Sequence, residues 1–290
     1  MTRPDDLDLR RDHASGAPAN QLDQEPHGRG PQLVIVAIAV LVACLAIAGW
    51  YWWSSDDEEG TGAVTEAPTE TGVDPSTTLG TGEAMDLPPL DELDPVLRSM
   101  LETLSARPEL ARLLATDNLL RRFVVSVENI GRGVSPVRQL QGVSVDGAFS
   151  VDRPNSESAV SPASFARYDG MTRTVAEIDR EGLARIYGQL KPRLAEAYGE
   201  LGGEGTFDMA MERAIVHLLQ VSPDQARGRV RPVKGLTYAW TSADTENLSS
   251  AQKQLLRMGP ENARRVQTTL RQLALALGIP AERLPQADGQ

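Results

Sequence analysis

The sequence predicts a mainly α-helical domain that is attached to a membrane by a single N-terminal transmembrane helix and an acidic flexible linker. Three observations lead to this fold class. Residues 33–53 form an apolar run without a charged residue, residues 54–87 contain nine acidic residues and no Lys or Arg, and from position 88 apolar residues recur at helical spacing. With 290 residues, of which 41% are hydrophobic, the chain can hold one domain of ordinary size and its tails.

The apolar run from Leu33 to Trp53 has the length of one membrane span. About 20 apolar residues cover a hydrocarbon core of roughly 30 Å. A second run of this length does not follow. Trp50, Tyr51 and Trp52 precede Trp53, and such aromatic rings are favourable at the headgroup level. The lipid bilayer is therefore an expected partner, contacted through this anchor.

The flanking charges predict the orientation of the span. Residues 1–32 contain four Arg and lack apolar periodicity, so we expect a disordered cytoplasmic tail. The segment after the span begins with the acidic cluster Asp56, Asp57, Glu58 and Glu59. Positively charged flanks stay on the cytoplasmic side. The C-terminal domain should therefore be exported.

Two processing signals are alternatives to an uncleaved anchor. A cleaved signal peptide is disfavoured by the long preceding tail and by the aromatic residues where a small-residue cleavage site should lie. The stretch before Cys44 resembles a lipoprotein signal, but further apolar residues follow instead of a polar tether. Because Cys44 is the only cysteine, the domain can form no internal disulfide and has no thiolate chemistry.

Residues 88–280 are expected to form a domain of about seven helices. Periodicity and capping residues place helical segments at 94–105, 108–115, 118–130, 165–168, 171–178, 179–201, 206–221, 249–258 and 260–277. Asp94 and Asp117 should each cap the helix that follows them, and Pro192 should kink or split its helix. Residues 148–151 and 230–240 have strand character. Residues 54–87 should be an extended, solvated linker and residues 281–290 a disordered tail.

Five stretches of the soluble part carry a family resemblance. They are LPPLDELD at 87–94, LLRRFVVSVENIGRG at 119–133, FARYDGM at 165–171, EAYGELG at 196–202 and QKQLLRMGPENARRVQTTLRQL at 252–273. With these motifs the chain resembles the bacterial family known as domain of unknown function 3014, and RMGPEN is the most specific piece. The resemblance implies an envelope protein of Gram-negative bacteria with one N-terminal span. Together with the flanking charges, this predicts an inner-membrane protein with a cytoplasmic N-terminus and a periplasmic domain. The resemblance implies no activity.

The residue types give little support to metal, cofactor or nucleic-acid chemistry. His217 is the only histidine after the span, and without a Gly-x-Ser-x-Gly motif it is expected to be a rim or core histidine with one hydrogen bond. His/Cys clusters and phosphate-binding glycine loops do not occur, so we expect neither a metal nor a cofactor. Residues 88–290 contain 25 acidic and 25 basic residues, which disfavours a nucleic-acid partner.

Four carboxylates are candidates for an enzyme. A periplasmic hydrolase acting on cell-wall material would need two acids that flank one bond. Glu128, Asp169, Asp208 and Glu261 are the residues that could supply such a pair. The catalytic residues are otherwise unknown from the sequence.

A second set of polar residues contains those that helical geometry places near the core. They are Arg121, Glu128, Arg167, Asp169, Arg257, Glu261 and Asn262. In a structural interpretation, Asn262 satisfies backbone groups at the Gly259–Pro260 junction, and the arginines bridge helices. In a functional interpretation, the arginines line a groove for a carboxylate or a peptide of an envelope partner. We expect a binding or scaffolding module, with the hydrolase as the alternative.

Overall fold

The computed structural model describes residues 78–101, 116–136, 139, 147–152, 158–233 and 238–286. The expected span at 33–53, the tail at 1–32, the helix at 108–115 and most of the linker lie outside these residues. Within the described part, no helix combines the length and apolar character needed to cross a bilayer.

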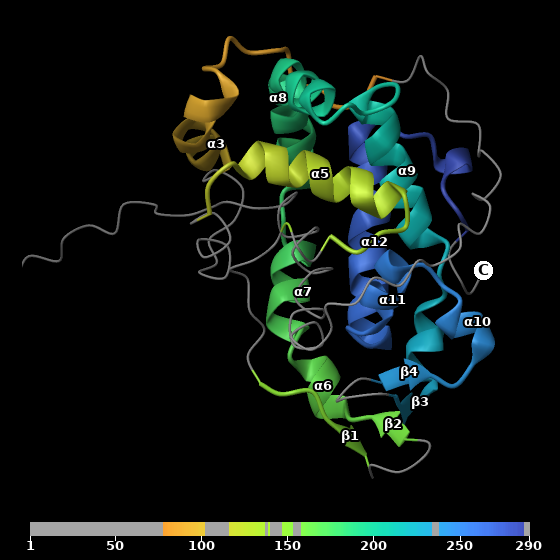
Figure 1. The fold of residues 1–290 in the computed structure, drawn as a ribbon. Coiled ribbons are helices and arrows are strands. Elements are labelled where there is room, and N and C mark those ends of the chain that lie inside the picture. The colour runs from red at the N-terminus through yellow and green to blue at the C-terminus, as the bar shows by residue number, and fades with distance from the viewer. Residues whose placement is uncertain are drawn as a thin grey trace, which may run out of the picture. The chain divides into compact units, whose positions relative to one another are not determined.

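The described part is mainly helical, as the sequence predicts (Figure 1). The α-helices are α3 (Leu93–Leu101), α5 (Leu119–Gly131), α6 (Pro162–Ala166), α7 (Asp169–Ala176), α8 (Arg180–Glu200), α9 (Phe207–Leu219), α10 (Ala243–Glu246), α11 (Ser250–Leu256) and α12 (Pro260–Leu277). Short 3-10 helices are η1 (Leu90–Glu92), η3 (Pro223–Arg227) and η4 (Ala281–Arg283). Of the α-helices described, seven have seven or more residues, which confirms the fold class of a helical domain.

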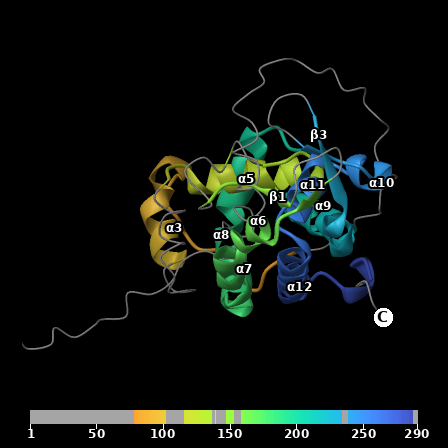
Figure 2. The same cartoon turned by 90° about the horizontal axis from the view of Figure 1, so that it is seen from below.

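Helices α5, α8, α9 and α12 surround the main core. Helix α5 runs across both α8 and α9, and α7 lies beside α12 (Figures 1 and 2). The predicted apolar stripe of α5 is buried, with Phe123 packing edge-on against Phe207 at 5.6 Å between ring centroids. Tyr187 and Tyr198 contact the same Phe207 ring at 6.2 and 5.7 Å. This aromatic group joins three of the four helices.

The N-terminus of α5 is capped from another helix. The backbone N–H groups of Asn118 and Leu119 donate to Oδ2 and Oδ1 of Asp94 at 2.7 and 3.0 Å. Asn118 is left-handed, with φ of 58°, and its side chain makes no capping bond. The predictions that Asp117 caps this helix and that Asp94 caps its own are therefore wrong. A cap 24 residues away depends on how α3 packs against α5, which local sequence does not encode.

An N-terminal strap, residues 79–87, packs onto α8 although the sequence predicts a solvated linker up to position 87. Leu79 is fully buried. Gly80 N donates to Leu277 O at 2.9 Å, and Thr81 N donates to Ala184 O at 3.1 Å. These contacts place the strap inside the domain, whose ordered part thus begins before position 88.

Helix α8 is continuous through Pro192, so the predicted split does not occur. A proline inside a helix costs about 3 kcal/mol or more. Burial of one large aliphatic side chain contributes roughly 1.5–3 kcal/mol, and α8 buries four, at Leu183, Ile186, Leu190 and Leu194. Packing therefore outweighs the cost of the proline.

The C-terminal boundary also differs from the expected position 280. Arg283 in η4 donates to Glu212 Oε2 at 2.7 Å, and Leu284 is buried. Residues beyond position 280, at least to Leu284, are thus part of the folded domain.

A small antiparallel sheet lies beside α6 and α10 (Figure 1). Its strands are β1 (Val151–Asp152), β2 (Ser158–Val160), β3 (Arg229–Pro232) and β4 (Tyr238–Trp240), in the order β1-β2-β3-β4. The predicted strand segment 230–240 contains most of β3 and all of β4, whereas the segment 148–151 overlaps β1 only at Val151. Strand β2 was not predicted, because three residues are too few to reveal a period of two.

Candidate functional site

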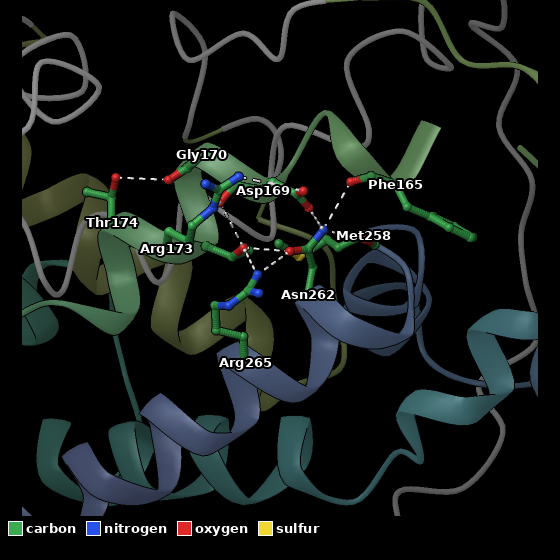
Figure 3. Close-up of polar contacts among 9 residues, drawn as sticks. Phe165, Asp169, Gly170, Arg173, Thr174, Met258, Asn262 and Arg265 are labelled. Carbon is green, nitrogen blue, oxygen red and sulfur yellow. Dashed lines mark hydrogen bonds and ion pairs between the residues drawn. The ribbon is translucent and has the colours of Figure 1, made fainter. Parts of the chain in front are cut away.

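Asn262, in the first turn of α12, is buried and forms the centre of a polar network (Figure 3). Its Nδ2 group donates to Phe165 O, to Asp169 Oδ1 and to Met258 O at 3.0, 3.0 and 3.1 Å. The acceptor Met258 O directly precedes the Gly259–Pro260 junction, in line with the structural interpretation of this residue. One amide thus holds together the end of α6, the start of α7 and the turn before α12.

The side-chain oxygen of Asn262 is satisfied as fully as its nitrogen. Thr172 Oγ1 and Arg265 Nη1 donate to Oδ1 at 2.6 and 2.7 Å. Arg265 Nη1 also donates to Thr172 Oγ1 at 2.9 Å, which closes a triangle of polar contacts between α7 and α12. Thr172 and Arg265 were missed in the sequence. Only the spacing of three residues between Asn262 and Arg265 on one helix could have indicated this contact.

Gly259 makes the close approach between α6 and the turn before α12 possible. Gly259 has φ of +86°, and a Cβ atom on it would lie 2.4 Å from Cγ of Phe165. A side chain there would separate α6 from the turn that precedes Pro260. The motifs FARYDGM and RMGPEN, distant in sequence, therefore meet face to face at this junction.

Glu128 forms a second buried polar centre. Its side chain is 7% exposed and accepts hydrogen bonds from Arg213 Nη2 at 2.7 Å and Arg132 Nε at 2.6 Å. Tyr198 Oη donates to the same carboxylate at 3.1 Å. Burial, and then the nearby Glu128 carboxylate, raise the pKa of the Tyr198 hydroxyl. The buried charge is thus paired with Arg132, which directly follows α5, and with Arg213 of α9.

Arg121 bridges α5 to other elements and does not pair with Glu128. It pairs instead with Glu200 Oε2 at 2.6 Å and Asp91 Oδ1 at 2.7 Å. Hydrogen bonds, first to Glu200 and then to Asp91, raise the pKa of its guanidinium. Seven helical residues separate Arg121 from Glu128, a rise of about 10 Å, so each carboxylate finds a nearer cation.

Arg167 and Arg257 bind backbone and amide groups. Arg167 donates to Ser164 O and Gly147 O, both at 3.0 Å. Arg257, which follows α11, donates to Gln254 Oε1 at 3.0 Å, and burial lowers the pKa of its guanidinium.

Glu261 is exposed and accepts from Arg264 at 2.8 Å and Arg227 at 3.3 Å. Of the seven predicted polar residues, a described hydrogen bond directly joins only Asp169 and Asn262. The arginines are held by separate partners, and no described contact joins Arg121 to Arg257.

His217 has the environment expected of a rim histidine. Its Nε2 atom forms a hydrogen bond of 2.7 Å with Ser249 Oγ. Burial lowers the pKa of the imidazole. Ser249 Oγ accepts from Gln252 N at 3.1 Å as the N-cap of α11, so this hydroxyl has a structural role.

The four carboxylates considered for a hydrolase bind four different sets of partners. Asp208, for example, accepts from Tyr187 Oη at 2.6 Å, Lys191 Nζ at 2.8 Å and Leu79 N at 2.9 Å, and so anchors the N-terminal strap. The described residues contain no group of three His, Cys, Asp or Glu side chains that could hold a metal ion. A cavity of about 20 Å³ between α5, α9 and α12 is lined by apolar side chains and has room for about one water molecule.

The fold and its polar centres define a class of protein, a helical domain with a small antiparallel sheet, in which buried polar side chains connect the helices. The chain belongs to the family described as "Protein of unknown function (DUF3014)", whose model matches residues 119–274. The match begins in α5 and ends in α12, so it contains both the Glu128 and the Asn262 centres, and it confirms the resemblance that the sequence motifs indicate. No curated protein and no solved structure matches the chain.

Proposed function

We propose that this chain is a single-pass protein of the bacterial inner membrane whose exported helical domain is a binding or scaffolding module of the cell envelope. The observation that carries the proposal is the Asn262 network, in which the most specific family motifs hold helices together. The proposed topology is supported by the charges that flank the apolar run at 33–53.

A domain held in this way suits binding. Association requires ordering of loops and side chains, and a rigid partner pays less of that entropic cost. Of the five hydrogen bonds on the Asn262 amide, those with Asp169 and Thr172 join α12 to α7, and the one to Phe165 O joins it to α6. Surfaces carried by these helices are therefore preorganised for a partner.

The carboxylate arrangement favours this proposal over a hydrolase. A pair of catalytic acids would have to flank one substrate bond, about 5–9.5 Å apart. Glu128 is instead buried between two arginines, whereas Glu261 lies in an exposed ion pair with Arg264. The structural use of these groups supports a scaffold.

Site-specific photo-crosslinking in intact cells tests the proposal. Crosslinking residues are placed at Val134, Leu201 and Leu275, which are exposed at 49%, 41% and 49%. A scaffold should give a discrete crosslinked partner from one of these faces and not from all of them. Release of soluble fragments from purified cell wall by the protein, without any such crosslink, would favour the hydrolase.

A reporter fused after Gln290 tests the topology. Activity of a periplasm-specific reporter is expected. Activity only of a cytoplasm-specific reporter would reject the proposed export of the domain.

A further inference from the structure

The outer face of the sheet carries two arginines that form no ion pair with any described residue. Arg229 and Arg231 are exposed, whereas Val230 between them is 3% exposed. Successive residues of a strand point to opposite faces, so both arginines lie on the solvent side. The described strand partners of these arginines are small, with Ala159 paired to Arg229 and Ala239 paired to Arg231. The two guanidinium groups therefore extend from a surface of short side chains.

Unlike Arg229 and Arg231, two other arginines nearby form ion pairs. Arg227, two residues before Arg229, pairs with Asp224 at 3.0 Å, and Arg264 pairs with the same carboxylate at 2.5 Å. Hydrogen bonds, first from Arg227 and then from Arg264, lower the pKa of Asp224. The Asp224 carboxylate is thus already shared by two cations, and the acid on the outer face of the sheet, Asp152, lies on β1, two strands away from Arg229.

The spacing of the two arginines indicates the shape of a matching ligand. Residues i and i+2 of a strand are about 6.5 Å apart. An extended polypeptide with Asp or Glu at every second position has the same repeat. The planar guanidinium group binds carboxylates through two parallel hydrogen bonds, which makes arginine well suited to this recognition.

We propose that the outer face of β3 docks an extended acidic segment of a partner protein, with carboxylates at alternate positions that pair with Arg229 and Arg231. This inference rests on the proposed binding function and adds the chemistry of the partner. A sheet-like anionic surface fits less well, because the register places exposed Asp152 on the same face, in one row with Ala159 and Arg229. A single acidic strand along β3 avoids that carboxylate, whereas a lipid headgroup layer would meet it.

Peptide binding to the full-length protein in nanodiscs of zwitterionic lipid tests the proposal. The probe is a fluorescent peptide of six Glu-Thr repeats, and the control peptide has the same composition with all Glu residues in one block. The wild type should bind the alternating peptide more tightly than the block peptide. Arg229→Gln/Arg231→Gln should weaken binding about tenfold, and added salt should weaken binding to the wild type.

The matched control is Arg173→Gln/Arg185→Gln, which removes the same charge from arginines whose side chains are 59% and 58% exposed. This variant should bind like the wild type. Circular dichroism and melting curves check that both double variants are folded, and the surface positions of all four arginines make loss of folding unexpected. Equal binding by Arg229→Gln/Arg231→Gln and the wild type would overturn the proposal.

Two further results would assign the face to another occupant and so reject the proposal. One is binding that appears only after Asp56→Asn, Asp57→Asn, Glu58→Gln and Glu59→Gln are combined, because the chain's own acidic segment would then be the occupant. The other is binding to anionic vesicles but not to the peptide. If the alternating peptide does not bind while crosslinks in cells persist, the scaffold proposal stands and the acidic-segment proposal is rejected. If the peptide binds but the reporter is active only in the cytoplasm, the proposed export is rejected and the acidic-segment proposal stands.

Discussion

Replacement of Asn262 by Ala tests whether the polar network holds the domain together. The substitution removes five hydrogen bonds. Asp169 and Arg265 are partly exposed and can be rehydrated, and Phe165 O still accepts from Tyr168 N, whereas Met258 O and Thr172 Oγ1 each lose a partner in a buried contact. An unsatisfied buried group costs about 1–3 kcal/mol, so we expect a loss of about 2–4 kcal/mol in the free energy of unfolding, against a typical total of about 5–15 kcal/mol.

Chemical denaturation of the full-length protein in detergent, followed by circular dichroism, measures this loss, and thermal melts should show a fall in Tm of roughly 4–16 °C. The matched control is Thr268→Ala on the exposed side of the same helix, which should change stability by less than about 0.5 kcal/mol. Equal stabilities of the Asn262 and Thr268 variants would refute the reasoning.

Asn262→Asp sharpens the test. The acceptor for Thr172 and Arg265 is kept, but the donors are lost and a second carboxylate is placed beside Asp169. At neutral pH this variant should be at least as unstable as Asn262→Ala. Part of the loss should be recovered in acid, because protonation removes the repulsion between the two carboxylates. A pH-independent deficit would contradict this account.

Three further predictions concern other parts of the domain. The pKa of His217 is lowered from 6.5 in the folded state, so the unfolded chain takes up a proton at a higher pH than the folded chain. Stability should therefore fall as the pH decreases below about 6.5. His217→Gln should flatten the stability profile measured between pH 5 and 7. A Cβ atom on Gly188 would lie 2.4 Å from the backbone of the N-terminal strap, whereas one on Gly199 meets nothing within 4 Å. Gly188→Ala should therefore lower the free energy of unfolding by about 1–3 kcal/mol, and Gly199→Ala should raise it by up to about 1 kcal/mol. Denaturation curves in which both substitutions change stability in the same direction would count against the close approach. Asp94→Ala should cost about 1–2 kcal/mol as the loss of a helix cap and Asp117→Ala, with a side chain 89% exposed, less than about 0.5 kcal/mol; the reverse order in a thermal melt would restore the local cap predicted from the sequence.

The helices could be predicted because their signals are local. The stripe of α5 and the start of α12 at Pro260 follow from periodicity and from the preference of proline for the first helical turn. The same reasoning failed where a contact joins distant positions. Asp94 caps a helix that begins 25 residues later, and the N-terminal strap is recognisable only once α8 is in place.

The candidate site shows the same division. Asn262 was selected because helical geometry puts a polar side chain on an apolar face, and such a residue must find partners when it is buried. Its contact with Thr172, 90 positions away, has no local signal. Arg229 and Arg231 did have one, the alternation Arg-Val-Arg in a segment with strand character, but their exposure depends on the pairing of β3 between β2 and β4.

The hydrogen bond from Gly80 to Leu277 places the N-terminal strap beside the C-terminal end of α12. From Asn262 to Leu277, α12 rises about 22 Å. If the proposed membrane anchor is correct, the tether enters the domain at the Leu277 end of α12 and leaves the Asn262 end and the neighbouring η3–β3 segment accessible.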